Sequence, residues 1–325
     1  MIIFNPAAGQ IESPERELAV AAEVWGERGW RVDLRPTAGP GDATRLAREG
    51  SNQGYDLVVA AGGDGTINEV VNGLVYSRTA MATLPLGTMN VWARELGLPL
   101  TPRAAAAALL NWQVRSIDLG RAGNRYFLLM AGIGIDAAIT SNVRSAEKRR
   151  FGAFVYVLST LNLLPRIRGT RARLIIDGRT VKGRVLWIVI GNSQLYGGLV
   201  KITHRASIDD GLLDVCMIRG DSFPSAVARL GSILLRRYTV DPDITYYRAR
   251  SIRVETRPSL PVQVDGDTIG KTPMEFVVVP GALRALLPPE LTTDLVQAAP
   301  PTTALARTGR GLQRLISWLG RKSVP

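Results

Sequence analysis

The segment "VVAAGGDGTINEVVNGL", residues 58–74, runs from an apolar stretch through three glycines and one carboxylate into a helical pattern. Its apolar residues recur at i, i+3, i+4 and i+7, and they are Ile67, Val70, Val71 and Leu74. This spacing predicts a helix over 66–75 with one buried face. Thr66, with Glu69 three residues later, has the pattern of a capping box, so we expect the helix to begin at the glycines.

A glycine turn before a helix is a natural phosphate site, because the backbone approaches a ligand closely and points unpaired N–H groups at it. Asp64 complicates this interpretation, because its carboxylate would repel a phosphate. It would have to bind Mg²⁺, take up a proton or lie on the ribose side of a nucleotide. The alternative is a tight strand-to-helix turn with a solvated aspartate. The G-x-x-x-x-G-K-[ST] pattern and the protein-kinase glycine loop are both missing, so a phosphate site here would be of another type.

The composition limits the classes of function. The chain has 325 residues, 46% of them hydrophobic, and this length suggests two domains with sizeable cores. A formal charge of +12 favours partners that carry phosphate, which are nucleic acids, nucleotides or an anionic membrane surface. Cys216 is the single cysteine, and its apolar surroundings in the sequence predict a buried strand residue. Because His204 is the single histidine, we expect acid–base chemistry to rest on carboxylates.

The order of strand and helix patterns along the chain predicts two folded domains. Strands such as "MIIF" and "DLVVAA" alternate with helical stretches in the first third, which implies βαβ units and a mostly parallel sheet. Closely spaced strand patterns follow, which predict a largely antiparallel β-domain. The chain after residue 290 is rich in Pro, Thr and Ala. We therefore predict an α/β domain over 1–116, a β-rich domain over 117–290, and a linker with a basic amphipathic C-terminal helix over 291–325.

No leader or membrane span is predicted. The opening "MIIFNPAAG" has the pattern of a strand and turn without a basic leader or cleavage region, so we expect a cytoplasmic protein. The longest apolar stretch, 151–164, is shorter than the roughly 20 residues that span a bilayer. Gly132, Gly134 and Ala137 form a G-x-G-x-x-A pattern after a strand. It is a weak dinucleotide signal, because no βαβ unit follows it.

Seven motifs follow one another along the chain and together resemble a known family. They are "NPAAG" (5–9), "TAGPGDATRLARE" (37–49), "GGDGTINEVVNGL" (62–74), "LPLGTMNVWARELGLP" (84–99), "GIGIDA" (132–137), "IDDGLLDV" (208–215) and "VDGD" (264–267). The series resembles the bacterial diacylglycerol kinase catalytic-domain family, which contains lipid kinases related to sphingosine and ceramide kinases and, more distantly, to NAD kinase. The resemblance covers nearly all of residues 1–290.

The resemblance implies a three-layer α/β domain with a mostly parallel sheet and a β-sandwich-like, mostly antiparallel second domain, with the active site in the cleft between them. It also implies ATP-dependent phosphorylation of a lipid hydroxyl. The residues that would surround ATP are Asn5, Pro6, Ala7, Ala8, Gly9, Thr37, Gly62, Gly63, Asp64, Gly65, Thr66, Asn68, Glu69, Gly87, Thr88 and Asn90. Short polar groups and glycines suit a polyphosphate, and Asn90, after the Gly87-Thr88 turn, is expected to brace a neighbouring loop.

Members of this family hold a structural Mg²⁺ in a D-D-G-x-L-D loop. In this chain the resemblance assigns that role to the backbone carbonyls of Ser207 and Leu212 and to the carboxylate of Asp210. Oxygen-only ligands in a short loop suit a hard cation. The alternative is an ordinary "DDG" hairpin turn.

The catalytic base of the family is the Glu of a "D-G-E" motif, which aligns with Asp267 here. Aspartate keeps the carboxylate but shortens the side chain by about 1.5 Å, and a misplacement of about 1 Å can reduce the rate roughly 100-fold. Either the loop compensates, or Asp265 or Asp64 does this work, or activity is low. Two further departures are Ala8, where the family usually has Ser, and Val91, where it commonly has Asp.

Two segments are candidates for membrane contact. The helical pattern over 144–164 is apolar in its main part, with Arg144, Lys148, Arg149 and Arg150 before the apolar stretch and Arg166, Arg168, Arg171 and Arg173 beyond it. It is either an interfacial helix or a core helix of the second domain. The tail "RGLQRLISWLGRK" has an apolar face and basic residues opposite, which indicates an interfacial anchor; the alternative is a helix docked on the first domain. We expect peripheral attachment to the inner face of the membrane.

The leading prediction is an ATP- and Mg²⁺-dependent lipid kinase that acts on diacylglycerol or a related lipid in an anionic membrane surface. The alternatives are an NAD kinase-like enzyme and a non-catalytic module that binds nucleotide or membrane. No nucleic-acid partner is expected, because no recognised module accompanies the charge. A homodimer is a possible assembly, and the sequence does not identify the lipid.

Overall fold

The structure is a computed structural model that describes residues 1–7, 13–134, 168–198, 200–235, 237, 240–290 and 295. Several sequence predictions lie outside these residues. They concern Ala8 and Gly9 of the expected ATP site, Ala137 of the G-x-G-x-x-A pattern, the helix over 144–164 and the C-terminal helix within 291–325.

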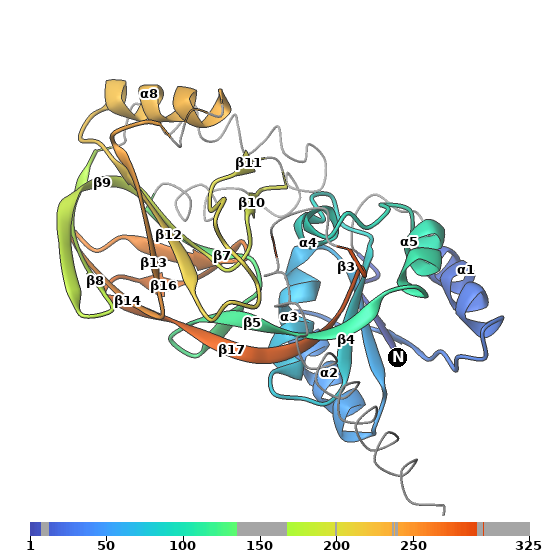
Figure 1. Cartoon of the computed structure of the whole chain (residues 1–325). Coiled ribbons are helices and arrows are strands. Elements are labelled where there is room, and N and C mark those ends of the chain that lie inside the picture. Colours follow the sequence, from blue (N-terminus) through green and yellow to red (C-terminus); the bar gives the residue numbers. More distant parts are fainter. Residues whose placement is uncertain are drawn as a thin grey trace, which may run out of the picture.

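The first domain is a parallel sheet covered on both faces by helices, as predicted. Its strands lie in the order β2 (Leu34–Pro36), β1 (Ile2–Phe4), β3 (Leu57–Gly62) and β4 (Ala80–Pro85). The helices α1 (Pro14–Gly26) and α5 (Pro102–Leu109) pack together on one face, and α2 (Asp42–Asn52) and α3 (Asp64–Leu74) pack on the other (Figure 1). Successive strand residues point to opposite faces, so β1, β3 and β4, which are covered on both sides, are largely apolar, whereas the edge strand β2 is exposed.

The predicted buried face of α3 is confirmed, but the predicted capping box is wrong. The helix begins at Asp64, two residues before the expected start, and its N-cap Gly63 makes no side-chain cap hydrogen bond. The Glu69 carboxylate instead accepts hydrogen bonds from the amides of Gly41 (2.9 Å) and Ala43 (3.1 Å) at the start of α2. Because the helix starts early, Glu69 lies in its second turn and faces the neighbouring helix.

The second domain is antiparallel and β-sandwich-like, as predicted. Its strands are β6 (Arg125–Phe127), β7 (Met130–Gly134), β8 (Thr170–Ile176), β9 (Arg179–Gly191), β12 (Leu213–Arg219), β13 (Ile244–Ala249), β14 (Ser251–Arg257), β15 (Pro261–Val264) and β16 (Asp267–Lys271), with a small separate pair of β10 (Leu195–Tyr196) and β11 (Val200–Lys201). Helix α8 (Phe223–Leu234) lies at the far end of this domain (Figure 1). Cys216 is buried in β12, as expected.

Two long strands join the domains. The strand β17 (Met274–Leu287) pairs antiparallel with β5 (Gln113–Ala122), begins beside β14 and ends parallel to β4, where Ala285 is in register with Met81. Figure 1 shows both strands crossing from one domain into the other. A boundary at residue 117 falls inside β5, so the domain ranges remain a prediction. None of the helices that the structure describes is both long and apolar enough to cross a bilayer.

A buried carboxylate fixes the bend in β17. The register of β17 against β5 shifts between Val279 and Leu283. At this point Asp118 of β5, only 3% exposed, accepts hydrogen bonds from the amides of Gly281 (2.8 Å) and Gly211 (2.6 Å). Burial raises the pKa of Asp118, while the two amides act in the opposite direction. Asp118 therefore links the strand that joins the domains to the loop before β12.

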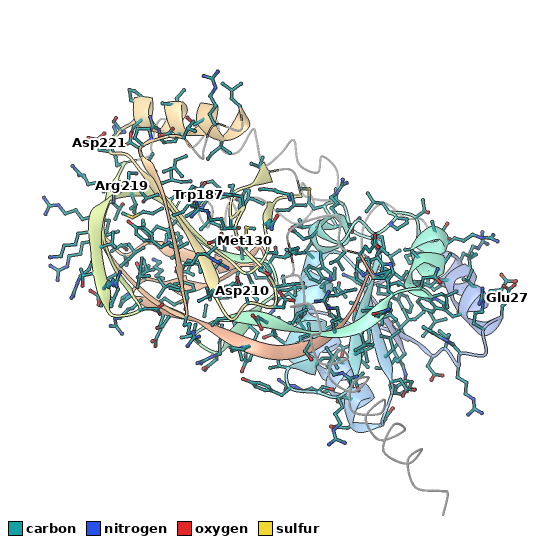
Figure 2. All side chains as sticks on the ribbon, viewed as in Figure 1. Glu27, Met130, Trp187, Asp210, Arg219 and Asp221 are labelled. Carbon is teal, nitrogen blue, oxygen red and sulfur yellow. The ribbon has the colours of Figure 1, made fainter. Side chains whose placement is uncertain are left out.

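Replacing Asp118 by Asn tests this link. The amide has one acceptor oxygen, so one buried N–H would face an NH₂ group, and leaving a buried donor unsatisfied costs about 1–3 kcal/mol. We expect urea unfolding to show a free energy of unfolding lower by about that amount. Glu27→Gln is the matched control, because Glu27 lies on the surface at the outer end of the first domain (Figure 2). Equal stability of the two variants would contradict this role for Asp118.

Candidate active site

The turns after the parallel strands meet at one edge of the sheet. The Thr37 amide, after β2, donates to the Phe4 carbonyl at 2.8 Å, and the Leu86 amide, after β4, donates to the Gly62 carbonyl at 3.2 Å. The turn after β1 is closed by the Asn5 side chain, which accepts from the Ala7 amide at 2.9 Å. Ligands of open α/β sheets bind at the carboxyl ends of the strands. The structure thus brings the turns that carry Asn5, Thr37, Gly63 and Gly87 to one edge of the sheet, while Asn68 and Glu69 lie further along α3.

The turns after β3 and β4 touch through glycines. A Cβ atom on Gly87 would lie 2.4 Å from the Gly63 Cα, which no side chain tolerates. Asn90, in the left-handed region at φ +48°, accepts from the Gly87 amide at 2.9 Å and donates to the Gly87 carbonyl at 2.8 Å. Asn90 therefore braces the Gly87-Thr88 turn itself, where the sequence predicted a brace on a neighbouring loop. Thr88 itself is exposed.

Asp64 joins the first turns of two helices. It is the first residue of α3, and its Oδ1 accepts from the Val91 amide at 2.8 Å at the start of α4 (Val91–Glu95). Burial raises the pKa of Asp64 to about 6, and the neighbouring charge of Asp265 adds to the rise. The carboxylate therefore satisfies the N-terminus of α4, while the amides at the start of α3, from Gly63 to Thr66, lie at the same edge of the sheet.

Asp265 is held by four donors and has no acceptor position left. It is a central residue of the tight turn between β15 and β16, with φ +45° and Gly266 next at +91°. Its buried carboxylate accepts hydrogen bonds from the Asn68 side chain (2.7 Å) and from the amides of Leu128 (2.8 Å), Leu129 (2.9 Å) and Met130 (3.0 Å). Burial raises its pKa. With both oxygens engaged, Asp265 positions the chain and is unsuited to take a proton from a substrate.

Asp267 has the most accessible carboxylate of the three catalytic candidates. Its side chain is 56% exposed at the start of β16 and lies 3.6 Å from Nη2 of Arg125 in β6. Asn72 fixes β6 to α3, because it accepts from the Tyr126 amide and donates to the Tyr126 carbonyl, both at 3.0 Å. Asp267 therefore lies beside α3, on the hairpin that Asp265 attaches to Asn68.

The roles of three residues near Asp265 and Asp267 were not predicted from the sequence. Asn68 was expected to contact ATP, but it is 1% exposed and its amide donates to Asp265 and to the Tyr126 carbonyl. Neither Asn72 nor Arg125 was predicted as a site residue. The spacing of Asn68 and Asn72, i and i+4 on one helix face beside the apolar stripe, was the available signal.

The loop predicted to hold a metal is rich in buried carboxylates. Asp210 accepts from the Leu212 amide at 2.9 Å and forms an ion pair with Arg248, and the Ser207 hydroxyl donates to Asp209 at 2.9 Å. Asp214, whose side chain is fully buried, has one oxygen without a hydrogen bond, and burial raises its pKa to about 6.

These oxygen donors fit a hard cation in kind, and Arg248 already supplies one positive charge to Asp210. No three His, Cys, Asp or Glu side chains of the described part of the chain form a metal-binding group, so the predicted set depends on the Ser207 and Leu212 carbonyls.

Glu95, at the end of α4, connects the first domain to the second. It is 3% exposed, and its two oxygens accept from the amides of Gln194 (3.1 Å) and Leu195 (2.8 Å). Burial raises the pKa of Glu95 to about 7. No local sequence pattern indicates this contact, because its partners lie about 100 residues away.

Comparison with known proteins agrees with this architecture. The family model described as the diacylglycerol kinase catalytic domain matches residues 1–122, and the YegS C-terminal NAD kinase beta sandwich-like domain matches residues 130–287. These define a two-domain kinase. The chain belongs to the diacylglycerol kinase family.

Individual relatives span nearly the whole chain. A protein named diacylglycerol kinase from Bacillus subtilis is 32% identical over 90% of this chain and 98% of its own length, and one from Staphylococcus aureus is 29% identical over 90% and 93%. A crystal structure of a diacylglycerol kinase from Bacillus anthracis superposes with a TM-score of 0.73 at 27% identity, over 89% of this chain and 96% of that one.

Gly87→Ala tests the contact between the two glycine turns. The added Cβ would meet the Gly63 backbone, which cannot move aside as a flexible side chain would, so we expect a loss of about 1–3 kcal/mol in the free energy of unfolding. Gly65→Ala is the matched control, because a Cβ there meets nothing within 4 Å. Urea unfolding of both variants is the measurement. A Gly87→Ala protein as stable as wild type would refute the close contact.

Glu95→Gln tests the buried carboxylate between the domains through pH. Between pH 4.5 and about 7 the folded state keeps the Glu95 proton while the unfolded state has released it. Stability from this group is therefore present at low pH and is lost as pH rises through about 7, by roughly 3 kcal/mol. Chemical denaturation at several pH values should show a smaller decline for Glu95→Gln than for wild type. The exposed Glu23→Gln variant should follow wild type, and an unchanged slope in Glu95→Gln would disprove the pKa assignment.

Proposed function

We propose that this protein is an ATP- and Mg²⁺-dependent lipid kinase that transfers the γ-phosphoryl group to the hydroxyl of diacylglycerol or a related lipid. The kinase family implies ATP as a substrate. One observation carries the proposal: the paired glycine turns after β3 and β4 lie at the carboxyl edge of the parallel sheet, next to the hairpin that presents Asp267.

In the proposed complex the phosphates contact backbone amides. The amides of Gly63 to Thr66 form the N-terminus of the 11-residue helix α3 and suit an anion through hydrogen bonding and the helix dipole. The Gly87-Thr88 turn, braced by Asn90, forms the opposite wall. Asn5, Pro6, Ala7 and Thr37 complete the site at the ends of β1 and β2.

Asp267 is the proposed base. Its carboxylate would accept the proton of the lipid hydroxyl as that oxygen attacks phosphorus, because Asp64 and Asp265 are engaged by backbone amides. Arg125, 3.6 Å from Asp267, adds a positive charge beside the transferred group. Mg²⁺, when bound, would offset the charge of the phosphates. A structural Mg²⁺ would be held by Asp210 and the carbonyls of Ser207 and Leu212.

The proposed place of action is the cytoplasmic face of the membrane, with the protein attached peripherally. A lipid substrate remains in the bilayer, so the enzyme has to work at a surface. The charge of +12 favours anionic surfaces.

The test is direct. The purified chain is incubated with radiolabelled ATP, Mg²⁺ and mixed-lipid vesicles, and the lipid extract is analysed by mass spectrometry. We expect labelled phosphatidic acid or another phosphorylated lipid. Phosphorylation of added NAD with no lipid product would favour an NAD kinase-like enzyme, and no product with either acceptor would favour a non-catalytic module.

Asp267→Asn should reduce kcat about 1,000-fold, because a general base contributes on the order of 100- to 10,000-fold. Asp267→Glu, which restores the longer side chain of the family, should retain or exceed wild-type turnover. Asp221→Asn is the matched control, because Asp221 lies on the surface near α8 (Figure 2). Full turnover by Asp267→Asn in the same lipid assay would show that another group accepts the proton.

A further inference from the structure

The outer face of the second domain carries a row of arginines produced by strand register. Arg171 in β8 is directly opposite Arg257 in β14 on one side and Arg184 in β9 on the other. Neighbouring strands are about 4.8 Å apart, so the three Cα atoms lie within about 10 Å. Like charges directly opposite each other destabilise a sheet. The row therefore carries a like-charge repulsion that a bound anion would relieve.

A second row extends the charge. Two residues further along each strand, Arg173 is opposite Glu255 and Lys182. Side chains i and i+2 of a strand share a face, so both rows point the same way. In β8, Arg171 and Arg173 are exposed, whereas Ala172 and Leu174, which point to the opposite face, belong to the domain core.

The two rows line a groove of about 680 Å³. We call it the basic groove. Its charged lining residues are Arg171, Arg173, Lys182, Arg184, Glu255 and Arg257. Glu255 is the one acid among them, and it pairs with Arg173 at 3.4 Å and with Arg253 at 3.0 Å. Among the described residues no acidic side chain forms an ion pair with Arg171, Arg184 or Arg257. Figure 2 shows nitrogen-tipped side chains projecting from the outer edge of β8 and β9.

We propose that the basic groove binds the phosphate groups of anionic phospholipid headgroups and holds the protein on the bilayer separately from its active site. This inference rests on the proposed function, because a lipid kinase has to remain at the surface where its substrate lies. Cationic side chains attract the phosphates of an anionic surface, and five cations against one carboxylate among the described lining residues give a strong excess of positive charge. Among the described residues, the lining contains no aromatic side chain on which a nucleic-acid base could stack, which favours lipid over single-stranded RNA.

Vesicle sedimentation without ATP tests the proposal. The full chain is mixed with vesicles of phosphatidylcholine and phosphatidylglycerol in equal parts. The triple variant Arg171→Gln, Arg184→Gln, Arg257→Gln should bind about 100-fold more weakly, because each cation near an anionic surface strengthens binding several-fold. It should be folded, because it removes only like-charge repulsion. The triple lysine variant at the same positions keeps the charge and should retain most of the binding.

The matched control removes three exposed cations from the first domain, Arg28, Arg31 and Arg103, by substitution with Gln. We expect only a small loss of binding. Equal losses in both glutamine triples would show attraction by net charge alone and would overturn the proposal, as would a lysine triple as weak as the glutamine triple. Loss of binding to a short single-stranded RNA with unchanged vesicle binding would also overturn it.

A second measurement distinguishes failure of this proposal from failure of the proposed function. Phosphorylation of a lipid dispersed in detergent should be the same in the groove variant and in wild type. If neither protein phosphorylates lipid but the groove variant still loses vesicle binding, the lipid kinase proposal is wrong and the proposal that the basic groove binds membrane is supported.

Discussion

The Asp265 carboxylate accepts hydrogen bonds from Asn68 of α3 and from three consecutive backbone amides, Leu128 to Met130. Asn68 belongs to the α/β domain, and Leu128 to Met130 belong to the β-domain. One buried side chain therefore holds the two domains together. A buried carboxylate is costly unless its acceptor positions are filled, and here four donors fill them. The hairpin that carries Asp267 depends on this arrangement, because Asp265 lies in its turn.

Other contacts between the domains act at different points of the same junction. Asp118 fixes the bend of β17, and Glu95 reaches from α4 to the amides of Gln194 and Leu195. The α/β side contributes a rigid phosphate-binding edge, in which Gly63 and Gly87 touch and Asp64 connects two helix starts. A kinase needs its nucleotide and its acceptor held in fixed relative positions, since misplacement by about 1 Å can cost roughly 100-fold in rate.

The sequence predicted what depends on local patterns. The α/β and β order, the buried face of α3 and the burial of Cys216 all follow from periodicity or from neighbours within a few residues. Contacts between distant residues were not predictable in this way. Glu69 was assigned to its own helix because its actual partners, Gly41 and Ala43, lie more than 25 residues away. Asp265 and the arginine row are further cases, since strand register alone brings their partners together.

The central claim is that the edge formed by the turns after β3 and β4 binds the nucleotide. Hydrogen–deuterium exchange measured with and without Mg·ATP tests it most directly. The account predicts slower exchange in the peptides that cover 61–67 and 86–92, where the first amides of α3 and the Gly87 turn lie. Unchanged exchange in both peptides, at a nucleotide concentration where calorimetry shows saturated binding, would contradict it.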